Sequence, residues 1–137
     1  MQHSSGGIEK LLKLARHQTQ HYRIDLVDLE KAIAASQQSL LELEQTLDRE
    51  VSPDHETVDT LRFQEGMRTR RMHLRTTLMS LEKTADDVRA RLEDSLMEIQ
   101  KLDHLVAEKR VATAREDAGR DQRIQDDVAA RTLRAER

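Results

Sequence analysis

The 137-residue sequence predicts an all-α fold: a long antiparallel two-helix coiled-coil hairpin with a charged C-terminal helical overhang. Three observations predict it. Apolar side chains recur in alternating steps of three and four, charged residues make up 36% of the chain against 1% aromatics, and a single proline interrupts the periodic stretches. Few aromatic side chains and helical periodicity are typical of long helices and coiled coils, not of a compact globular core.

Composition also limits the classes of function. The net charge of −3 gives the chain no overall attraction to nucleic acid or anionic lipid. The absence of cysteine excludes disulfides and thiolate metal sites. No apolar run approaches the roughly 20 residues that a membrane span needs, and the first residues lack the apolar core of a signal peptide. We therefore expect a soluble cytoplasmic protein without a transmembrane segment.

The first helix is expected over about residues 8–50, after a flexible leader at residues 1–7 that contains two serines and two glycines. One set of positions in this helix repeats every seven residues and is mostly apolar or small. These seam positions are Ile8, Leu12, Ala15, Thr19, Tyr22, Leu26, Leu29, Ile33, Ser36, Leu40, Leu43 and Leu47. Such spacing keeps one face of a helix against a partner helix.

The periodicity breaks at residues 51–54, around the single proline. Pro53 has no N–H and clashes with the preceding turn, so it either ends the first helix or opens the second. Ser52 as the N-cap, followed by Asp54 and Glu56 near the positive helix end, makes a coherent start signal. The second helix is expected over about residues 54–131, with a frayed tail at 132–137.

The second helix has a strong seam only between residues 74 and 106. Its positions are Leu74, Leu78, Leu81, Ala85, Val88, Leu92, Ser95, Ile99, Leu102 and Val106. Upstream, the same register continues through Arg71, Met67 and Gln64. A four-residue stutter would instead place Phe63 and Arg70 on the seam.

Two helices joined by one short break fold back antiparallel most simply, so the residue numbers of paired positions have a constant sum. A tip at residue 53 gives a sum of 106, whereas matching the two apolar seams gives sums of 114 and 121. The seam-matched pairing leaves fewer aliphatic side chains uncovered and predicts a loose arch over about residues 51–70. In either pairing, the last 30 or so residues extend past the first helix as an overhang of mixed charge.

Motifs for catalysis or metal binding are weak. His17 and His21 have a spacing that can hold a metal, but no third ligand shares their face, so we interpret them as exposed polar residues. Adjacent acids such as Asp86 and Asp87 diverge by about 100° on a helix and cannot share a proton. The sequence has no glycine-rich phosphate loop and no nucleophile motif. We expect a protein that is not an enzyme and has no cofactor.

A basic cluster follows the break. It consists of Arg68, Arg70, Arg71, His73 and Arg75. A docking patch for an acidic protein and a solvated helix face explain it equally well. Nucleic-acid binding is less favoured, because stacking aromatics are missing.

Three segments carry a family resemblance. The first is the run from Ile8 to Leu14 with Arg16 and His17; the second comprises Phe63, Gly66, Arg70, Arg71, Leu74 and Leu81-Glu82; the third is the charged ending with Lys101-Leu102-Asp103, Glu108-Lys109-Arg110, Arg115-Glu116, Asp121-Gln122, Asp126-Asp127 and Arg131. In their order, these parts resemble the FliJ family, small coiled-coil proteins of flagellar type III protein export, and its relatives in injectisomes. The acidic pair is Asp-Asp where Asp-Glu is more usual in that family.

The resemblance implies a two-helix coiled coil that resembles the central stalk of rotary ATPases and lies at the cytoplasmic side of the flagellar base, peripheral to the inner membrane. It implies binding to the hexameric export ATPase, to the cytosolic domain of the export gate and to export chaperones. The candidate ATPase-ring residues are Leu102, Glu108, Arg110, Arg115, Glu116, Gln122 and Asp126. The candidate export-gate residues are Phe63, Arg70, Arg71 and Leu74. The rival interpretation is a self-associating structural coiled-coil scaffold or adaptor, because leucine at both kinds of seam position does not fix stoichiometry.

Overall fold

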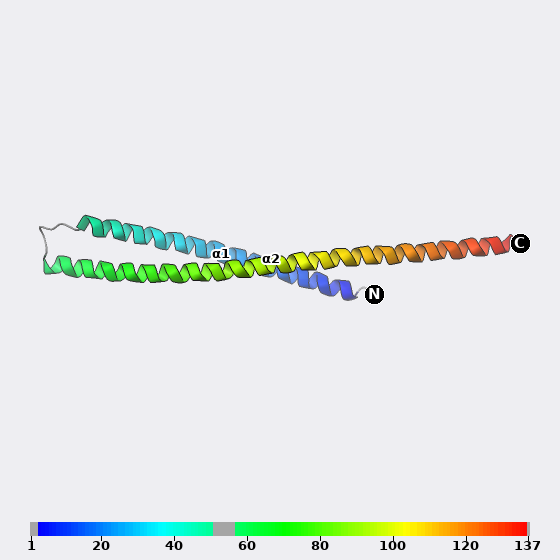
Figure 1. The fold of residues 1–137 in the computed structure, drawn as a ribbon, viewed down its shortest axis with the longest axis horizontal. Helices are drawn as coiled ribbons and strands as arrows, with labels where there is room; N and C mark the ends of the chain where they lie inside the picture. Colours follow the sequence, from blue (N-terminus) through cyan, green and yellow to red (C-terminus); the bar gives the residue numbers. More distant parts are fainter. Residues whose placement is uncertain (1–2, 51–56, 137) are drawn as a thin grey trace. The chain divides into compact units, whose positions relative to one another are not determined.

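The computed structural model describes residues 3–50 and 57–136, with side-chain exposure for 6–49 and 57–136. Two helices account for almost all of these residues: α1, His3–Glu50, and α2, Val58–Ala135 (Figure 1). No strand occurs in the described ranges, so the prediction of an all-helical chain with two long helices is confirmed. Contacts divide the chain into unit 1 (Met1–His17 and Ser95–Arg137) and unit 2 (Gln18–Asp94). Both helices contribute to both units.

The start of α1 differs from the prediction. The flexible leader expected over residues 1–7 is wrong for residues 3–7, which belong to the helix. Neither Gly6 nor Gly7 adopts a positive φ, and Gly6 is half-buried. Adding residues to an existing helix costs far less than nucleating a new one, so a few poor helix formers at its end are accommodated.

Thr57 forms the N-cap of α2. Its Oγ1 accepts a hydrogen bond from the backbone N–H of Thr60 at 3.2 Å, and its carbonyl accepts one from the N–H of Leu61 at 3.0 Å. Asp59 lies in the first turn, where the helix dipole stabilises negative charge. The hydroxyl of Thr57 thus satisfies an N–H group that has no intrahelical acceptor at a helix start, and its carbonyl accepts the first intrahelical hydrogen bond of α2.

The predicted start signal at Ser52 and Pro53 lies outside the described residues. The loose arch over residues 51–70 overlaps the second helix expected from about residue 54, and its described part from Val58 onward is continuous helix, as expected for that helix. At its other end α2 reaches Ala135, so the frayed tail expected at 132–137 is wrong for residues 132–135. The hydroxyl of Thr132 donates to the carbonyl of Val128 at 2.9 Å within this last stretch.

Unit 2 packs along the predicted seam positions. Each seam position between residues 19 and 47, and between 74 and 92, is buried or half-buried. Ala85 is the most deeply buried, at 0% exposure. The seam thus identifies the covered face of each helix in this unit.

The weak start of α2 follows the continuous register. Gln64, Met67 and Arg71 are half-buried, whereas Phe63 and Arg70 are exposed. The stutter that would have placed Phe63 and Arg70 on the seam is therefore wrong. Polar side chains occupy two of the three covered positions, which explains why the apolar pattern alone did not decide between the registers.

Two ion pairs connect the helices of unit 2. Arg75 Nη2 lies 3.0 Å from Glu44 Oε1, and Arg89 Nη2 lies 3.7 Å from Glu30 Oε1. The two residue numbers add up to 119 in each pair, so partners fall from 89 to 75 on α2 as they rise from 30 to 44 on α1. The cyan segment of α1 and the green segment of α2 lie side by side in this unit (Figure 1). The pairing in which residue numbers add up to 106 is therefore wrong. The observed sum of 119 lies between 114 and 121, the two sums obtained by matching the apolar seams.

Unit 1 has a small apolar core. Leu12, Ala15 and Leu102 are buried together, and Ile8, Ile99 and Val106 pack against them as partly buried side chains. Ser95 Oγ donates to the carbonyl of Ala15 at 3.5 Å. Arg16 Nη2 lies 3.3 Å from Asp103 Oδ1, a pair whose numbers also add up to 119. Few apolar side chains share the burial, so each one contributes a large part of the unit's stability.

Neither helix, over its described length, has a stretch long and apolar enough to cross a membrane.

Candidate partner-binding surfaces

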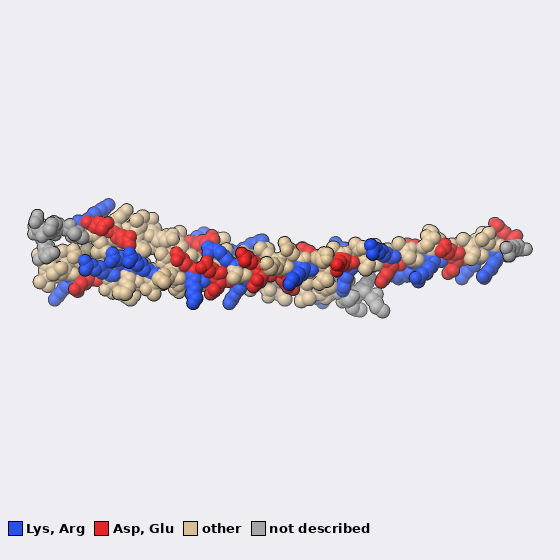
Figure 2. All heavy atoms as spheres, viewed as in Figure 1, with Lys and Arg blue, Asp and Glu red and all other residues tan. Residues whose placement is uncertain are grey.

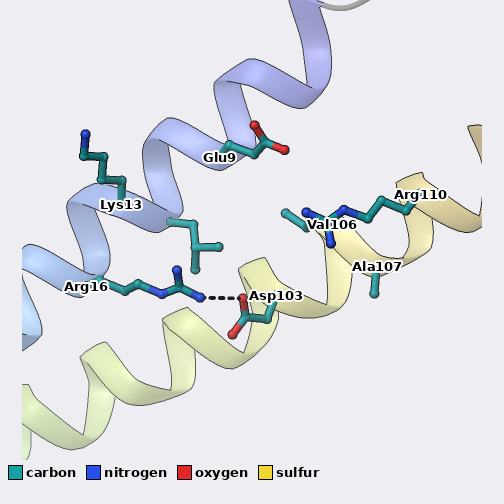
Figure 3. Close-up of a pocket in the computed structure, with 8 residues that line it drawn as sticks. Glu9, Lys13, Arg16, Asp103, Val106, Ala107 and Arg110 are labelled. Carbon is teal, nitrogen blue, oxygen red and sulfur yellow. Dashed lines mark hydrogen bonds and ion pairs between the residues drawn. The ribbon is translucent and has the colours of Figure 1, made fainter.

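A groove lies between α1 and α2 in unit 1 (Figure 3). Its volume is about 460 Å³, and the residues lining it are Glu9, Leu12, Lys13, Arg16, Asp103, Val106, Ala107 and Arg110. Arg16 reaches across it to Asp103, and Arg110 points back toward Val106 (Figure 3). Leu12 and Val106 give the groove an apolar base, and the charged residues surround it.

A second hollow of about 360 Å³ continues this groove along α2. It shares Glu9, Val106 and Arg110 with the first and adds Lys109 and Asp117 among its charged residues. An apolar base with charged edges suits a side chain from a partner helix.

The candidate ATPase-ring residues fall into two classes. Leu102 is only 6% exposed and packs against Leu12 and Ala15, so it is unavailable to a partner while unit 1 is packed. The other candidates are all exposed on α2. They are Glu108, Arg110, Arg115, Glu116, Gln122 and Asp126.

The segment from Arg110 to Glu136, here called the C-terminal segment, is exposed and is helical as far as Ala135. Every residue in it is exposed apart from Gly119, which is half-buried. Basic and acidic side chains alternate along it (Figure 2), so neither sign of charge dominates its surface.

Local side-chain pairs support this helix. Arg120 Nη2 lies 2.9 Å from Asp117 Oδ1, and Gln122 Nε2 donates to Asp126 Oδ1 at 3.1 Å. Pairs three or four residues apart stabilise a helix by roughly 0.2–0.5 kcal/mol each. The segment is thus held by contacts within its own helix and leaves its faces open.

The candidate export-gate residues do not share one surface. Phe63 is 44% exposed and Arg70 is exposed, whereas Arg71 and Leu74 are half-buried on the covered face of α2. The structure therefore leaves Phe63 and Arg70 as the accessible members of this group.

The basic cluster is partly compensated within unit 2. Arg68 and Arg71 line a hollow of about 450 Å³ together with Asp48, and Arg75 pairs with Glu44. Solvation of a helix face and pairing across the unit therefore account for part of the cluster.

The histidine pair gains no metal site from the fold. Within residues 3–50 and 57–136, no group of three or more histidine, aspartate or glutamate side chains is arranged to hold a metal ion. His17 and His21 thus gain no further ligands from the rest of the described chain.

One set of exposed residues is not among those predicted from the sequence. Ile24, Val27 and Leu41 lie on α1 in unit 2, and each has about half of its surface exposed. They belong to a second series with steps of three and four, which continues through Lys31, Ala34 and Gln38. This second series was the signal in the sequence, hidden by the stronger first seam.

No protein-family description, curated protein or solved structure matches the chain.

Proposed function

We propose that this chain is a non-enzymatic component of the flagellar type III protein export apparatus. It is a stalk-like antiparallel coiled coil that binds the export ATPase ring through the C-terminal segment and promotes export of flagellar subunits. The observation that carries the proposal is the exposed, charged C-terminal segment, which continues directly from the packed core of unit 1. The charged ending resembles that of the FliJ family, and this resemblance is the reason for proposing the export ATPase ring as the partner of the segment.

Residue pairing supports the antiparallel arrangement. In unit 2, partners on α2 fall in number as those on α1 rise, and the covered residues follow a seven-residue repeat. In unit 1, the pairing sum of 119 places residue 116 opposite His3, the first described residue of α1. Positions beyond residue 116 then lie past the described start of α1 and form the overhang.

Exposed charges suit a contact that selects a partner and its orientation. Charged groups at an interface contribute more to specificity and association rate than to affinity. Arg110 and Arg115 are exposed near the start of the C-terminal segment, where they can meet acidic groups of the ring. The chain supplies no catalytic group in this proposal. It promotes ATP hydrolysis by binding the assembled ring more tightly than the free subunits, which shifts the assembly equilibrium.

The export gate is the second proposed partner. Phe63 and Arg70 are accessible on α2 in unit 2 and provide an aromatic and a cationic group for this contact. Chaperones that deliver late flagellar substrates are the third partner. Binding to the ring and gate places the chain at the cytoplasmic side of the flagellar base, peripheral to the inner membrane.

Charge reversal in the C-terminal segment tests the ring contact. The full chain carrying Arg110→Glu and Arg115→Glu should bind the export ATPase at least about tenfold more weakly, since exposed charge pairs each contribute a fraction of a kcal/mol and reversal makes them repulsive. The matched control is Arg62→Glu with Arg91→Glu, which makes the same charge change at exposed positions of unit 2. If both variants bind the export ATPase as tightly as the unaltered chain does, the ring-binding site does not lie in this segment.

The alternative function is a self-associating structural scaffold or adaptor. The half-exposed Ile24, Val27 and Leu41 favour it, because a second copy could cover this apolar series on α1. Light scattering over a range of concentrations discriminates between the two functions. A tight dimer or trimer that persists on dilution supports the scaffold, and a chain that is monomeric on dilution supports the stalk-like function.

A further inference from the structure

We propose that the C-terminal segment pairs with the same segment of a second copy, antiparallel and centred on residue 125. The contact is a docking surface between two copies of this chain. It does not depend on the proposed export function, and it differs from the scaffold alternative because it uses charged residues of α2 and not the apolar series on α1.

The face that makes this contact continues the packed face of α2. In unit 1 the covered face passes through Ile99, Leu102 and Val106, and the same steps lead to the half-buried Lys109. Continued further, the steps of three and four define a C-terminal seam whose members are all exposed. These members are Glu116, Arg120, Arg123, Asp127, Ala130 and Arg134.

When two copies of the C-terminal segment lie antiparallel, charges of one C-terminal seam face opposite charges of the other. With paired residue numbers adding up to 250, Glu116 of one copy meets Arg134 of the other. In the same register Arg123 meets Asp127, and Arg120 meets the small Ala130. Two-fold symmetry makes each of these pairs occur twice.

Residues beside the seam differ from that sum by two, because they flank the paired positions. Asp117 lies near Arg131 of the second copy and Ile124 near its own counterpart, each with a sum of 248. The one unfavourable contact brings Asp126 near its counterpart. The hydrogen bond from Gln122 Nε2 to Asp126 Oδ1, at 3.1 Å, partly offsets that repulsion.

A parallel pairing is disfavoured by the same charges. In register, it would place Glu116, Arg123 and Asp127 each opposite an identical charge along the centre of the contact. Like charges in contact destabilise helix pairing, whereas the antiparallel arrangement turns these positions into attractive pairs. The charge pattern therefore favours a second copy of this segment as the partner and favours the antiparallel arrangement.

The contact should be weak and sensitive to salt. Ile124 and Val128 are the large apolar residues near its centre, and neither belongs to the seam, so exposed ion pairs provide most of the attraction. Salt screens such pairs, and each contributes little by itself. We expect a dimer at high protein concentration and low ionic strength that dissociates as salt is added.

Sedimentation equilibrium of the full chain in low and high salt tests the proposal. Glu116→Arg and Arg134→Glu should each weaken dimerisation about 10- to 50-fold, because each reversal makes two symmetric pairs repulsive. An equimolar mixture of the two variants should recover dimerisation, since the mixed dimer again pairs opposite charges at both places. The matched control is Asp121→Arg, an exposed position on the same helix but outside the seam, which should dimerise like the unaltered chain.

Recovery on mixing separates a lost contact from a damaged helix, and circular dichroism of each variant checks its helicity directly. A chain that stays monomeric at every concentration in low salt overturns the proposal. So does a dimer that neither single variant weakens, or one that the mixture fails to recover. If the chain self-associates but neither salt nor any of the three substitutions weakens the assembly, the contact would instead lie at Ile24, Val27 and Leu41 on α1.

Discussion

Replacement of Leu102 by alanine should strongly destabilise unit 1. Leu102 is 6% exposed and packs against Leu12 and Ala15. Truncating a buried leucine costs about 2–5 kcal/mol, from lost burial plus the cavity that remains. A small core relaxes more easily than a large one, so we expect the lower part of this range, about 2–3 kcal/mol.

Hydrogen exchange measures this loss where it occurs. A free-energy loss of about 2–3 kcal/mol raises the population of the open state roughly 30- to 150-fold, since each 1.4 kcal/mol is a factor of ten. The amides around Leu12 and Leu102 should exchange faster by that factor. Amides around Ala85, in unit 2, should change less.

Leu105→Ala is the matched control, because Leu105 lies one turn away on the same helix and is 43% exposed. It should change exchange in unit 1 only a few-fold. If both substitutions accelerate exchange equally, the assignment of Leu102 to a core and Leu105 to the surface is refuted.

Three further substitutions test other parts of the fold. Ala85→Leu should cost about 1–3 kcal/mol by overpacking a fully buried position, and the exposed Ala90→Leu should change thermal unfolding little. Gly66→Ala should stabilise the chain by about 0.5–1 kcal/mol in urea unfolding, because an added Cβ meets no atom within 4 Å at this helical position; a lower midpoint would contradict continuous helix there. Thr57→Ala should cost about 1 kcal/mol and speed hydrogen exchange at the amide of Thr60, and unchanged exchange would exclude the cap.

The covered faces of the helices were predictable because a seven-residue repeat is a local property. Leu43 and Leu47 on α1, and Ala85 on α2, are buried where the repeat places them. The register between the helices was less predictable, because apolar side chains tolerate several alignments. Ion pairs such as Arg75 with Glu44 distinguish the alignments, and nothing in the sequence alone marks which charges pair.

Helix ends were the least predictable feature. Thr57 caps α2 through contacts to two backbone N–H groups, whereas the sequence pattern pointed to Ser52 with Pro53, which lie outside the described residues. Among the candidate site residues, Leu102 satisfied both a core pattern and a family resemblance, and its burial places it in the core. Phe63 and Arg70 could not be separated from Arg71 and Leu74 without the register that leaves only the first two exposed.

The export ATPase itself provides the most direct test of the proposed function. The full chain is mixed with the flagellar export ATPase of the same organism, and ring assembly and ATP hydrolysis are followed together. The stalk-like function predicts that hexamers form at lower ATPase concentration and that hydrolysis rises with them. Absence of binding and of stimulation by a chain that circular dichroism shows to be helical would contradict the export function.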